Sequence, residues 1–335
     1  LGLRPVHGGI TLVMSTHMNR FLELNEENQT ARVQPGISGP VYEHTLNRAP
    51  ERLRAGRRYT GGHFPQSFEY STVGGWVVTL GSGQASTYYG DAADLVLSQE
   101  YVTPAGDFRT LDYPATATGP KVGDIMKGAE GAFGILVEVT LRVYRYMPAN
   151  RRHFSFMFPN WQAAVDASRE IAQGEFGRPA VYRISDPEET DRGLKLYGIP
   201  DLADRFLQKR GLAPMARCLC LGNVEGDRDY TRLVKRKIRR VARRYGAFIL
   251  GPYGSKKWAQ TRYREPYMRE DLNDFGITID TLECAVAWDR LMDLHQHVRA
   301  FIKSRPRTMC LTHASHFYPQ GTNLYFIFIG RFESV

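Results

Sequence analysis

Four glycine-rich turns in the first 148 residues place the strongest constraint on the fold of this chain. They are "HGG" (7–9), "STVGG" (71–75), "GSG" (81–83) and "GAEGAFG" (128–134). Adjacent glycines cost conformational entropy, so they are expected where the backbone turns tightly or lies against something flat. Short runs of alternating apolar and polar residues separate these turns, which is typical of strands. The first 148 residues are therefore predicted to form an α+β domain.

Several elements of this first domain can be predicted from their patterns. Strands are expected in "ITLVMS" (10–15) and "TARVQPG" (30–36), with a polar turn at Asn25–Asn28 and a helix over Val41–Leu53. The run "LVLSQEYVTPAGDFRTL" (95–111) predicts a hairpin whose strands are joined by Pro104–Asp107. The last glycine turn leads into an alternating strand that ends at Pro148.

The composition changes after Pro148, and a strand–helix–strand order then appears twice. This order predicts a second α+β domain from residue 149 onward. The expected strands are "RRHFSFMFPN" (151–160), "RPAVYRISD" (178–186), "ARCLCLGNVEGD" (216–227) and "AFILGP" (247–252). One expected helix follows Asn160 as its N-cap and stops at Gly174, and a second covers 230–246, where apolar residues recur at helical spacing.

The composition is that of an ordinary globular protein of two or three domains. Of the 335 residues, 42% are hydrophobic and 24% are charged, without a run of roughly eighteen apolar residues that would predict a membrane-spanning helix. The four cysteines have neither zinc-site spacing nor the density of a disulfide framework, so no metal site is expected. Cys218 and Cys220 alternate on an expected strand and are predicted to be buried thiols, which fits a reducing compartment.

The net charge of +9 favours acidic partners. The strongest basic cluster lies in the helix around residues 233–245, and three interpretations remain open for it. It could be a solvated helix face, a surface that docks on anionic lipid, or a nucleic-acid site. The last interpretation is the weakest, because exposed aromatic residues are not interleaved with the basic ones.

The glycine turns also indicate a kind of ligand. They do not match the G-x-G-x-x-G pattern of a Rossmann fold, and the chain has no Gly-Lys-Ser/Thr of a Walker loop. Ser and Thr at their edges, together with exposed backbone N–H groups, suit a large, flat ligand that carries a pyrophosphate.

The amino-acid sequences of these segments resemble those of a known family. "GHFPQSFEYSTVGGWV", "SGQASTYYG", "VTPAGDF" and "GAEGAFGILVEVTLRV" together resemble the PCMH-type FAD-binding domain of the vanillyl-alcohol-oxidase flavoproteins. Among these, the chain is most similar to the alkylglycerone-phosphate synthases, also called alkyl-dihydroxyacetonephosphate synthases. "VYRISD", "YREPYMREDL", "DTLECAVAWDRLMDL" and "YPQGTNLYFIF" extend the resemblance over nearly the whole chain. It implies a FAD-binding domain of two α+β subdomains over residues 1–148 and an α+β cap or substrate domain over 149–335.

The resemblance implies that the glycine-rich segments bind FAD. The implied cofactor-binding residues are Pro5, Val6, His7, Gly8, Gly9, Gln66, Ser67, Phe68, Glu69, Tyr70, Ser71, Thr72, Gly74, Gly75, Thr79, Leu80, Gly81, Ser82, Glu130, Gly131, Ala132, Phe133, Gly134, Ile135 and Leu136. His7 and His63 lie near these segments and are candidates for covalent attachment of the flavin. Histidine in such turns more often only forms hydrogen bonds, so non-covalent FAD is expected.

Three residues are implied to act on the substrate. Arg183 in "VYRISD" corresponds to an active-site arginine, Arg269 in "PYMRED" to the arginine that binds the substrate phosphate, and Tyr325 in "NLYFIF" to the acid/base tyrosine. A forked guanidinium suits phosphate, and a phenol exchanges protons near neutral pH only in a pocket of low polarity beside a positive group. Without the resemblance, such residues are more often surface ion pairs or core aromatics.

The chain also departs from the family pattern. The pyrophosphate loop of the family continues with a Gly and a Thr, whereas Gly9 is followed here by Ile10. The consecutive-histidine motif that follows the tyrosine in the family is not found before Val335. The expectation is therefore that segments are missing before residue 1, between residues 9 and 10, and after residue 335.

Three functions remain open at this point. The first is an FAD-dependent transferase that exchanges the acyl group of acyl-dihydroxyacetone phosphate for a long-chain alcohol in ether-lipid synthesis. The second is an FAD-linked oxidase or dehydrogenase of a D-2-hydroxy acid, and the third is a flavoprotein without catalysis. The partner is expected to be a small lipid phosphate or hydroxy acid and not nucleic acid, with a peripheral membrane surface and a homodimer as options. The expected location is intracellular, cytoplasmic or peripheral on a membrane, and peroxisomal if the source is eukaryotic.

Overall fold

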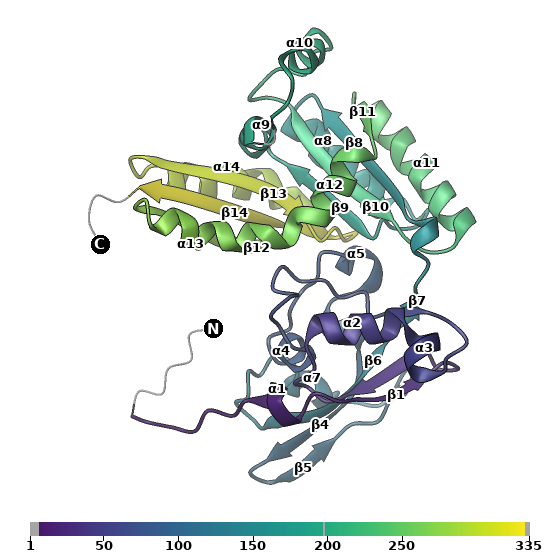
Figure 1. The fold of residues 1–335 in the computed structure, drawn as a ribbon. Coiled ribbons are helices and arrows are strands. Elements are labelled where there is room, and N and C mark those ends of the chain that lie inside the picture. Colours follow the sequence, from purple (N-terminus) through teal and green to yellow (C-terminus); the bar gives the residue numbers. More distant parts are fainter. Residues whose placement is uncertain (1–6, 197, 332–335) are drawn as a thin grey trace. The chain divides into compact units, whose positions relative to one another are not determined.

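The computed structural model describes residues 7–196 and 198–331, which form two compact units (Figure 1). Unit 1 contains the residues up to Gly83 and those from Gly90 to Tyr146. Unit 2 contains Gln84–Tyr89 and the residues from Met147 onward. A short segment inside the first half of the chain therefore belongs to unit 2, which the sequence patterns did not predict.

Unit 1 is built on an antiparallel sheet. Among the described residues, this sheet has five strands in the order β1–β2–β6–β4–β5. The strands of unit 1, including the separate β3–β7 pair, are β1 Phe21–Asn25, β2 Thr30–Val33, β3 Tyr59–Thr60, β4 Val96–Thr103, β5 Gly106–Arg109, β6 Ile135–Arg142 and β7 Tyr144–Arg145. The helices of unit 1 are α1 Met14–His17, α2 Gly39–Asn47, α3 Ala49–Leu53, α4 Val73–Val78, α6 Ala92–Leu95 and α7 Val122–Met126.

One face of the unit 1 sheet forms the core. Ala31 and Val33 of β2 are fully buried and belong to a cluster with Tyr42 and Leu46 of α2 and Trp76 of α4. The alternation of β2 places Thr30 and Arg32 on the opposite face. The apolar alternation in "TARVQPG" thus predicted this strand correctly.

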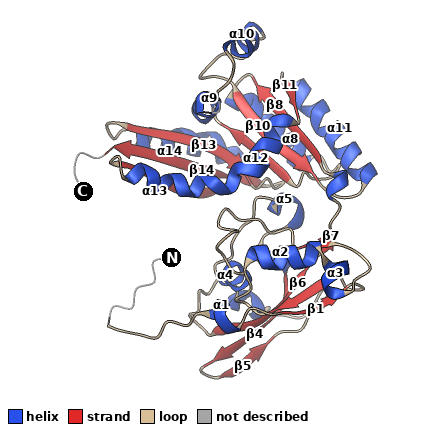
Figure 2. Cartoon of the chain, viewed as in Figure 1, coloured by secondary structure: helices blue, strands red, loops and turns tan. Residues whose placement is uncertain are grey.

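Unit 2 is built on a larger antiparallel sheet with helices on both faces (Figure 2). Among the described residues, its seven strands follow the order β11–β8–β10–β9–β13–β14–β12. Their bounds are β8 Arg152–Phe158, β9 Val181–Ser185, β10 Cys218–Val224, β11 Phe248–Gly251, β12 Ile277–Ala287, β13 Thr308–Ser315 and β14 Gly321–Arg331. The helices are α5 Ser86–Tyr89, α8 Trp161–Gln173, α9 Pro187–Leu196, α10 Asp201–Lys209, α11 Arg228–Arg244, α12 Tyr253–Thr261, α13 Met268–Asn273 and α14 Leu291–Lys303, with 3-10 turns η1 Pro148–Asn150, η2 Arg262–Tyr267 and η3 Trp288–Arg290.

The two faces of the unit 2 sheet differ in chemistry. One face is apolar and packs against α8, α11 and α14, with Phe156, Ile184 and Phe326 fully buried in its core. Cys218 and Cys220 lie in this core as free, fully buried thiols, as predicted. The other face carries polar residues of several strands and is the location of the candidate site.

Most patterned elements occur as predicted. Asn160 caps α8 by accepting a hydrogen bond from the backbone N–H of Ala163, and the hairpin β4–β5 turns at Pro104-Ala105, so that Gly106 and Asp107 already belong to β5. The helix expected over Val41–Leu53 is divided at Arg48 into α2 and α3, because Pro50 cannot donate a backbone hydrogen bond.

One strand prediction was wrong. Residues 10–13 of "ITLVMS" form no strand, and the short helix α1 begins at Met14. Ile10, Leu12 and Val13 are exposed, so the alternation there has no neighbouring strand against which to bury one face.

Candidate active site and cofactor segments

The candidate active site begins with a row of paired residues across the polar face of the unit 2 sheet. Tyr325 on β14 is the register partner of Glu283 on β12 and of His313 on β13, and His313 is in turn the partner of Ser185 on β9. Directly paired residues of antiparallel strands point to the same face of a sheet. Arg183 lies two residues before Ser185 and therefore shares this face. The register thus brings Arg183 and Tyr325, both predicted from the resemblance, onto one surface.

Helix α9 supplies a buried carboxylate to this row. It begins directly after β9 ends, and the backbone N–H of Leu219 on β10 donates to Thr190 Oγ1 of α9. From this helix Glu189 Oε1 accepts a hydrogen bond from Arg183 Nη2 at 2.7 Å and lies 3.1 Å from His313 Nδ1. Glu189 therefore joins the predicted arginine to a histidine that the sequence analysis did not identify.

The charge of Glu189 is fixed by its neighbours. Burial alone would raise the pKa of this carboxyl, but the charges of His313 and Arg183 and the hydrogen bond from His313 outweigh burial and lower the pKa to about 2. Glu189 is therefore ionised at neutral pH. Against an ionised carboxylate His313 Nδ1 carries a proton and donates it.

Tyr325 is stacked on the imidazole of His313. The two ring centroids are 4.9 Å apart, and the ring planes are inclined by 25°. On the other side of Tyr325, Glu283 accepts a hydrogen bond from Asn323 Nδ2 at 2.5 Å, and burial raises the pKa of Glu283. The phenol thus has a partly buried carboxyl as one neighbour in the sheet and an imidazole as the other.

An indole and two guanidinium groups lie beside this row. Arg183 Cζ is 5.7 Å from the ring centroid of Trp258 on α12, and Arg262 Cζ is 5.6 Å from the same ring. Such cation–π contacts are worth about 0.5–2 kcal/mol and orient the guanidinium plane. Arg183 is consequently held both by an ionic contact with Glu189 and by an aromatic contact with Trp258.

A second buried histidine lies at the end of β13. His316 Nδ1 is 2.7 Å from Ser86 Oγ, and Tyr318 Oη donates to the same hydroxyl at 3.0 Å. Burial is the main reason why the pKa of His316 is lowered to about 4, and the charges of His313 and Arg262 lower it further. His316 is therefore neutral at physiological pH. Its backbone has a φ of +56°, an uncommon value for a residue other than glycine.

The predicted phosphate-binding residue, Arg269, lies on α13. Its side chain is more than half exposed, and its guanidinium is 4.0 Å from Asp280 on β12. This loose, exposed ion pair leaves the guanidinium accessible to an anion. The role of Arg269 remains a prediction.

In unit 1, three of the four predicted cofactor segments surround helix α4. The segment from Gln66 to Thr72 leads into this helix, and Thr72 caps it by accepting a hydrogen bond from the Gly75 N–H. The segment Thr79–Ser82 follows its end. The backbone N–H groups of Gly128 and Glu130 donate to carbonyls of Val77 and Val78, which fixes the last glycine turn beside the same helix end.

The double glycine has a structural reason of its own. A Cβ on Gly74 would lie 2.3 Å from Pro35 Cβ, whereas a Cβ on Gly75 would meet only Thr72 Oγ1, at 3.3 Å. Both glycines lie in the first turn of α4. Gly74 is thus required by close packing on Pro35, and a contact of either glycine with a flavin remains a prediction.

The remaining cofactor predictions vary in how far the structure describes them. Pro5 and Val6 lie outside the described residues, whereas His7, Gly8 and Gly9 are described and exposed. His63 is 3% exposed and packs against Trp76 with ring centroids 4.6 Å apart. This packing leaves the His63 imidazole little surface on which a flavin could be attached.

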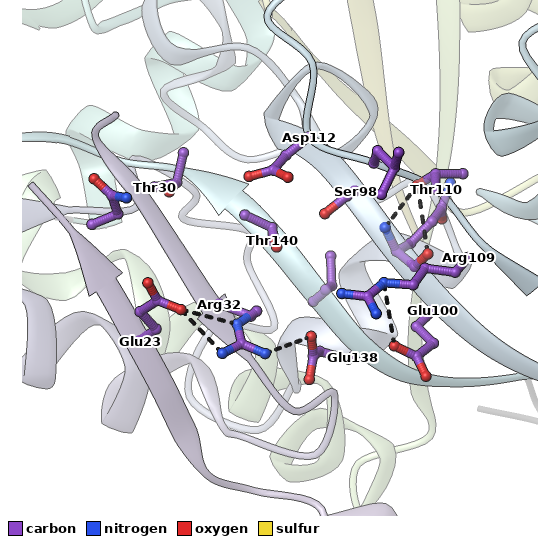
Figure 3. A pocket seen from close by; sticks show the side chains of 14 residues that line it. Glu23, Thr30, Arg32, Ser98, Glu100, Arg109, Thr110, Asp112, Glu138 and Thr140 are labelled. Atoms are coloured by element: carbon purple, nitrogen blue, oxygen red, sulfur yellow. Dashed lines mark hydrogen bonds and ion pairs between the residues drawn. The ribbon is translucent and has the colours of Figure 1, made fainter. Parts of the chain in front are cut away.

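The open face of the unit 1 sheet contains a polar hollow (Figure 3). Its volume is about 320 Å³, and five of the charged side chains that line it form ion pairs. Arg32 bonds to Glu23 at 3.0 Å and to Glu138 at 3.1 Å, and Arg109 lies 3.8 Å from Glu100. The predicted cofactor residues do not line this hollow.

Other surfaces of the described residues hold a basic stripe but no metal cluster. Helix α11 exposes arginines at helical spacing, and they are discussed below. Between residues 7 and 331, leaving out residue 197, we find no group of three or more His, Cys, Asp or Glu side chains arranged to hold a metal ion. In the same residues every helix is too short or too polar to cross a lipid bilayer.

Family models match both units. The model described as "FAD linked oxidases, C-terminal domain" matches residues 147–333, and that described as "FAD binding domain" matches residues 2–112. This chain belongs to the FAD-linked oxidase family. FAD is accordingly its cofactor.

Individual members of the family resemble the chain to different extents. An alkyldihydroxyacetonephosphate synthase of Dictyostelium discoideum is 31% identical over 94% of this chain and 52% of that protein. A glycolate oxidase subunit of Bacillus subtilis strain 168 is 31% identical over 51% of this chain and 34% of that protein. A solved alkyldihydroxyacetonephosphate synthase superposes with a TM-score of 0.81 at 31% identity, covering 94% of this chain and 57% of the other. The chain spans about half the length of the curated synthase that it matches.

The solved structures also identify the fold. Substrate-bound p-cresol methylhydroxylase superposes with a TM-score of 0.66 at 13% identity, over 94% of this chain and 64% of that chain. At this identity the match shows a common fold alone. The PCMH-type fold expected from the sequence is therefore confirmed, with helices and sheets mixed in both units.

The described cofactor segments of this member of the FAD-linked oxidase family suit a flat ring system. Tyr70, Leu80, Phe133 and Ile135 lie in or beside these segments and are 44–74% exposed. A bound flavin or adenine ring would cover such apolar surface, and Gly131 has a φ of +86° with open space where a Cβ would point. The segments thus fit FAD, while the role of each residue remains a prediction.

Proposed function

We propose that this chain belongs to an FAD-dependent transferase that exchanges the acyl group of acyl-dihydroxyacetone phosphate for a long-chain alcohol. The observation that carries the proposal is the gathering of Arg183, His313 and Tyr325 on one polar face of the unit 2 sheet, with Glu189 joining the first two. The similarity to alkyldihydroxyacetonephosphate synthases over 94% of the chain supports the same conclusion.

Each residue has a chemical task in this proposal. Arg269, exposed on α13, binds the substrate phosphate through its forked guanidinium. Arg183 is oriented by Glu189 and Trp258 and presents its guanidinium to the substrate oxygens. Tyr325, whose ring is stacked on the imidazole of His313, takes a proton from the substrate carbon and returns it. FAD, when bound, supplies the electron-accepting ring chemistry for the exchange.

A second candidate is an FAD-linked oxidase or dehydrogenase of a D-2-hydroxy acid. It is favoured by the similarity of part of the chain to a glycolate oxidase subunit. An arginine that is oriented to bind phosphate also binds a carboxylate bidentately, so Arg183 and Arg269 suit either substrate. The two candidates differ in whether the flavin is reduced by the substrate.

One experiment separates the two functions. The purified protein, loaded with FAD, is mixed without oxygen with D-lactate or D-2-hydroxyglutarate while flavin absorbance is followed at about 450 nm. We expect no bleaching with either acid. In parallel, incubation with palmitoyl-dihydroxyacetone phosphate and radiolabelled hexadecanol is expected to give labelled alkyl product in the wild type and not in Tyr325→Phe. Rapid bleaching without labelled product would reject the transferase in favour of the oxidase.

A further inference from the structure

His313 lies between the buried carboxylate of Glu189 and the ring of Tyr325. Its Nδ1 is 3.1 Å from Glu189 Oε1, and its ring centroid is 4.9 Å from that of Tyr325. His313 is 8% exposed at its side chain and Glu189 is 11% exposed, so solvent screens their interaction weakly. A positive charge on an imidazole in this position therefore interacts strongly with a negative charge on the phenol.

The contacts of Glu189 favour the charged form of this imidazole. Glu189 is ionised and directs its Oε1 at His313 Nδ1, so the N–H at that position is held by a charge-assisted hydrogen bond. The charge of Glu189 then stabilises a second proton on Nε2 of the same ring. Because Arg183 already balances one unit of negative charge, the Arg183–Glu189–His313 group carries a net positive charge when His313 is protonated.

We propose that His313, held as a cation by Glu189, is a positioning residue that stabilises the phenolate of Tyr325 and sets the pH range in which Tyr325 exchanges a proton. The inference rests on the acid/base role of Tyr325 in the proposed function. It adds two residues, His313 and Glu189, for which neither the sequence motifs nor the similarity to relatives had indicated a role.

Other titratable groups near His313 and Tyr325 also affect how easily the phenolate forms. Glu283 faces Tyr325 from β12, and its carboxylate opposes formation of the phenolate when it is ionised. His316, which follows β13, is neutral near pH 7 because its pKa is about 4. Arg262 on η2 is close enough to His316 to lower that pKa. His316 Nε2 also lies 4.0 Å from Glu283 Oε1. Of the two described register partners of Tyr325, Glu283 and His313, it is His313 whose positive charge can offset Glu283.

The test is a direct titration of Tyr325 in the 335-residue chain without substrate. The protein is labelled with ¹³Cζ-tyrosine, the Tyr325 resonance is assigned from Tyr325→Phe, and its titration midpoint is measured by NMR. His313→Phe keeps a stacked ring but removes the charge. We expect this variant to raise the Tyr325 midpoint by about one unit or more, as loss of an adjacent opposite charge does.

The chain contains a matched control on the apolar side of the sheet. His295 on α14 stacks on Trp161 with centroids 4.8 Å apart, and its Nε2 lies 3.2 Å from Asp186 Oδ2. His295→Phe therefore removes a stacked, carboxylate-bonded histidine that does not touch Tyr325. It should leave the Tyr325 midpoint within about a quarter of a unit of wild type. If His313→Phe fails to fold, His313→Gln provides the same removal of charge in a smaller polar side chain.

Two results would overturn the inference. One is an unchanged Tyr325 midpoint in a folded His313 variant, and the other is an equal shift in His295→Phe. The titration needs neither substrate nor turnover, so its result is independent of the proposed function. A shifted midpoint in a protein without transferase activity rejects the proposed function alone, and an active transferase with an unshifted midpoint rejects the role of His313 alone.

Discussion

The guanidinium of Arg183 and the carboxylate of Glu189 form a buried ion pair, with Nη2 and Oε1 separated by 2.7 Å and both side chains about one-tenth exposed. Removing one partner of such a pair leaves an uncompensated charge in a medium of low polarity. Glu189→Gln is therefore expected to lower the free energy of unfolding by about 3–5 kcal/mol, measured by urea denaturation at pH 7. An exposed pair supplies the control. Glu170→Gln, which removes the partner of Arg244, should cost less than about 1 kcal/mol.

The same carboxylate makes stability depend on pH at the acid end. The pKa of Glu189 is lowered from 4.5 to about 2 in the folded chain, so its contribution is fully present above pH 4.5 and is lost as the pH falls through 2. The difference in unfolding free energy between wild type and Glu189→Gln should therefore shrink from pH 5 to pH 2. A difference that stays constant over this range would show that Glu189 is not ionised in the folded state.

The lowered pKa of His316 predicts that stability also depends on pH in a second, higher range. Burial lowers its pKa from 6.5 to about 4, so the unfolded chain binds a proton that the folded chain does not bind. Stability is therefore greatest above pH 6.5 and falls as the pH decreases to 4, by roughly 3 kcal/mol for a shift of this size. His316→Gln should flatten this part of the curve. His153, whose pKa is also lowered to about 4, titrates in the same range, so the double variant with His153→Gln should flatten it further.

The adjacent glycines of α4 give a matched pair of substitutions. Gly74→Ala places a Cβ 2.3 Å from Pro35 Cβ and should cost about 1–3 kcal/mol of unfolding free energy through overpacking. Gly75→Ala meets only Thr72 Oγ1 at 3.3 Å and should change stability by less than about 1 kcal/mol. Thermal unfolding of the FAD-free chain measures both. Equal costs would contradict the packing argument, and weaker FAD binding by a stable Gly75→Ala would support the predicted cofactor contact.

The sequence predicts local elements of this fold better than its site. Strand β8, helix α8 and strand β10 follow directly from their periodicity and from the Asn160 cap. The alternation of residues 10–13 misled, because a strand pattern does not show whether a neighbouring strand exists. Resemblance to a family indicated Arg183 and Tyr325.

Glu189 and His313 were missed for a physical reason. Their role depends on the register of β9, β13 and β14 and on the start of α9 in the space where β9 ends. Neither the spacing nor the composition of the chain records this register. One signal was available in the sequence. Both "LTHAS" and the later "LYF" of Tyr325 have a strand-like pattern, which predicts two strands that could pair.

The last prediction concerns the arginine stripe of α11. Arg236, Arg239, Arg240 and Arg243 are exposed at helical spacing and line one shallow hollow. The pKa of Lys235 on the same helix is lowered, mainly by burial and further by the charges of Arg152, Arg239 and Lys256. Positive charge is therefore concentrated around this helix. Each such charge gains about 1 kcal/mol beside an anionic membrane, so the chain is expected to sediment with phosphatidylserine vesicles but not with phosphatidylcholine vesicles.

A charge-matched pair of variants tests whether α11 itself is responsible. Changing Arg236, Arg239, Arg240 and Arg243 to Gln should weaken sedimentation more than tenfold, because several favourable charge contacts are lost together. Changing the exposed Arg52, Arg54, Arg57 and Arg58 of unit 1 to Gln removes the same charge and should have little effect. Salt near 1 M should abolish binding of the wild type and of both variants, because the Debye length falls to about 3 Å. Equal loss in both variants would assign the binding to net charge and leave α11 as a solvated helix face.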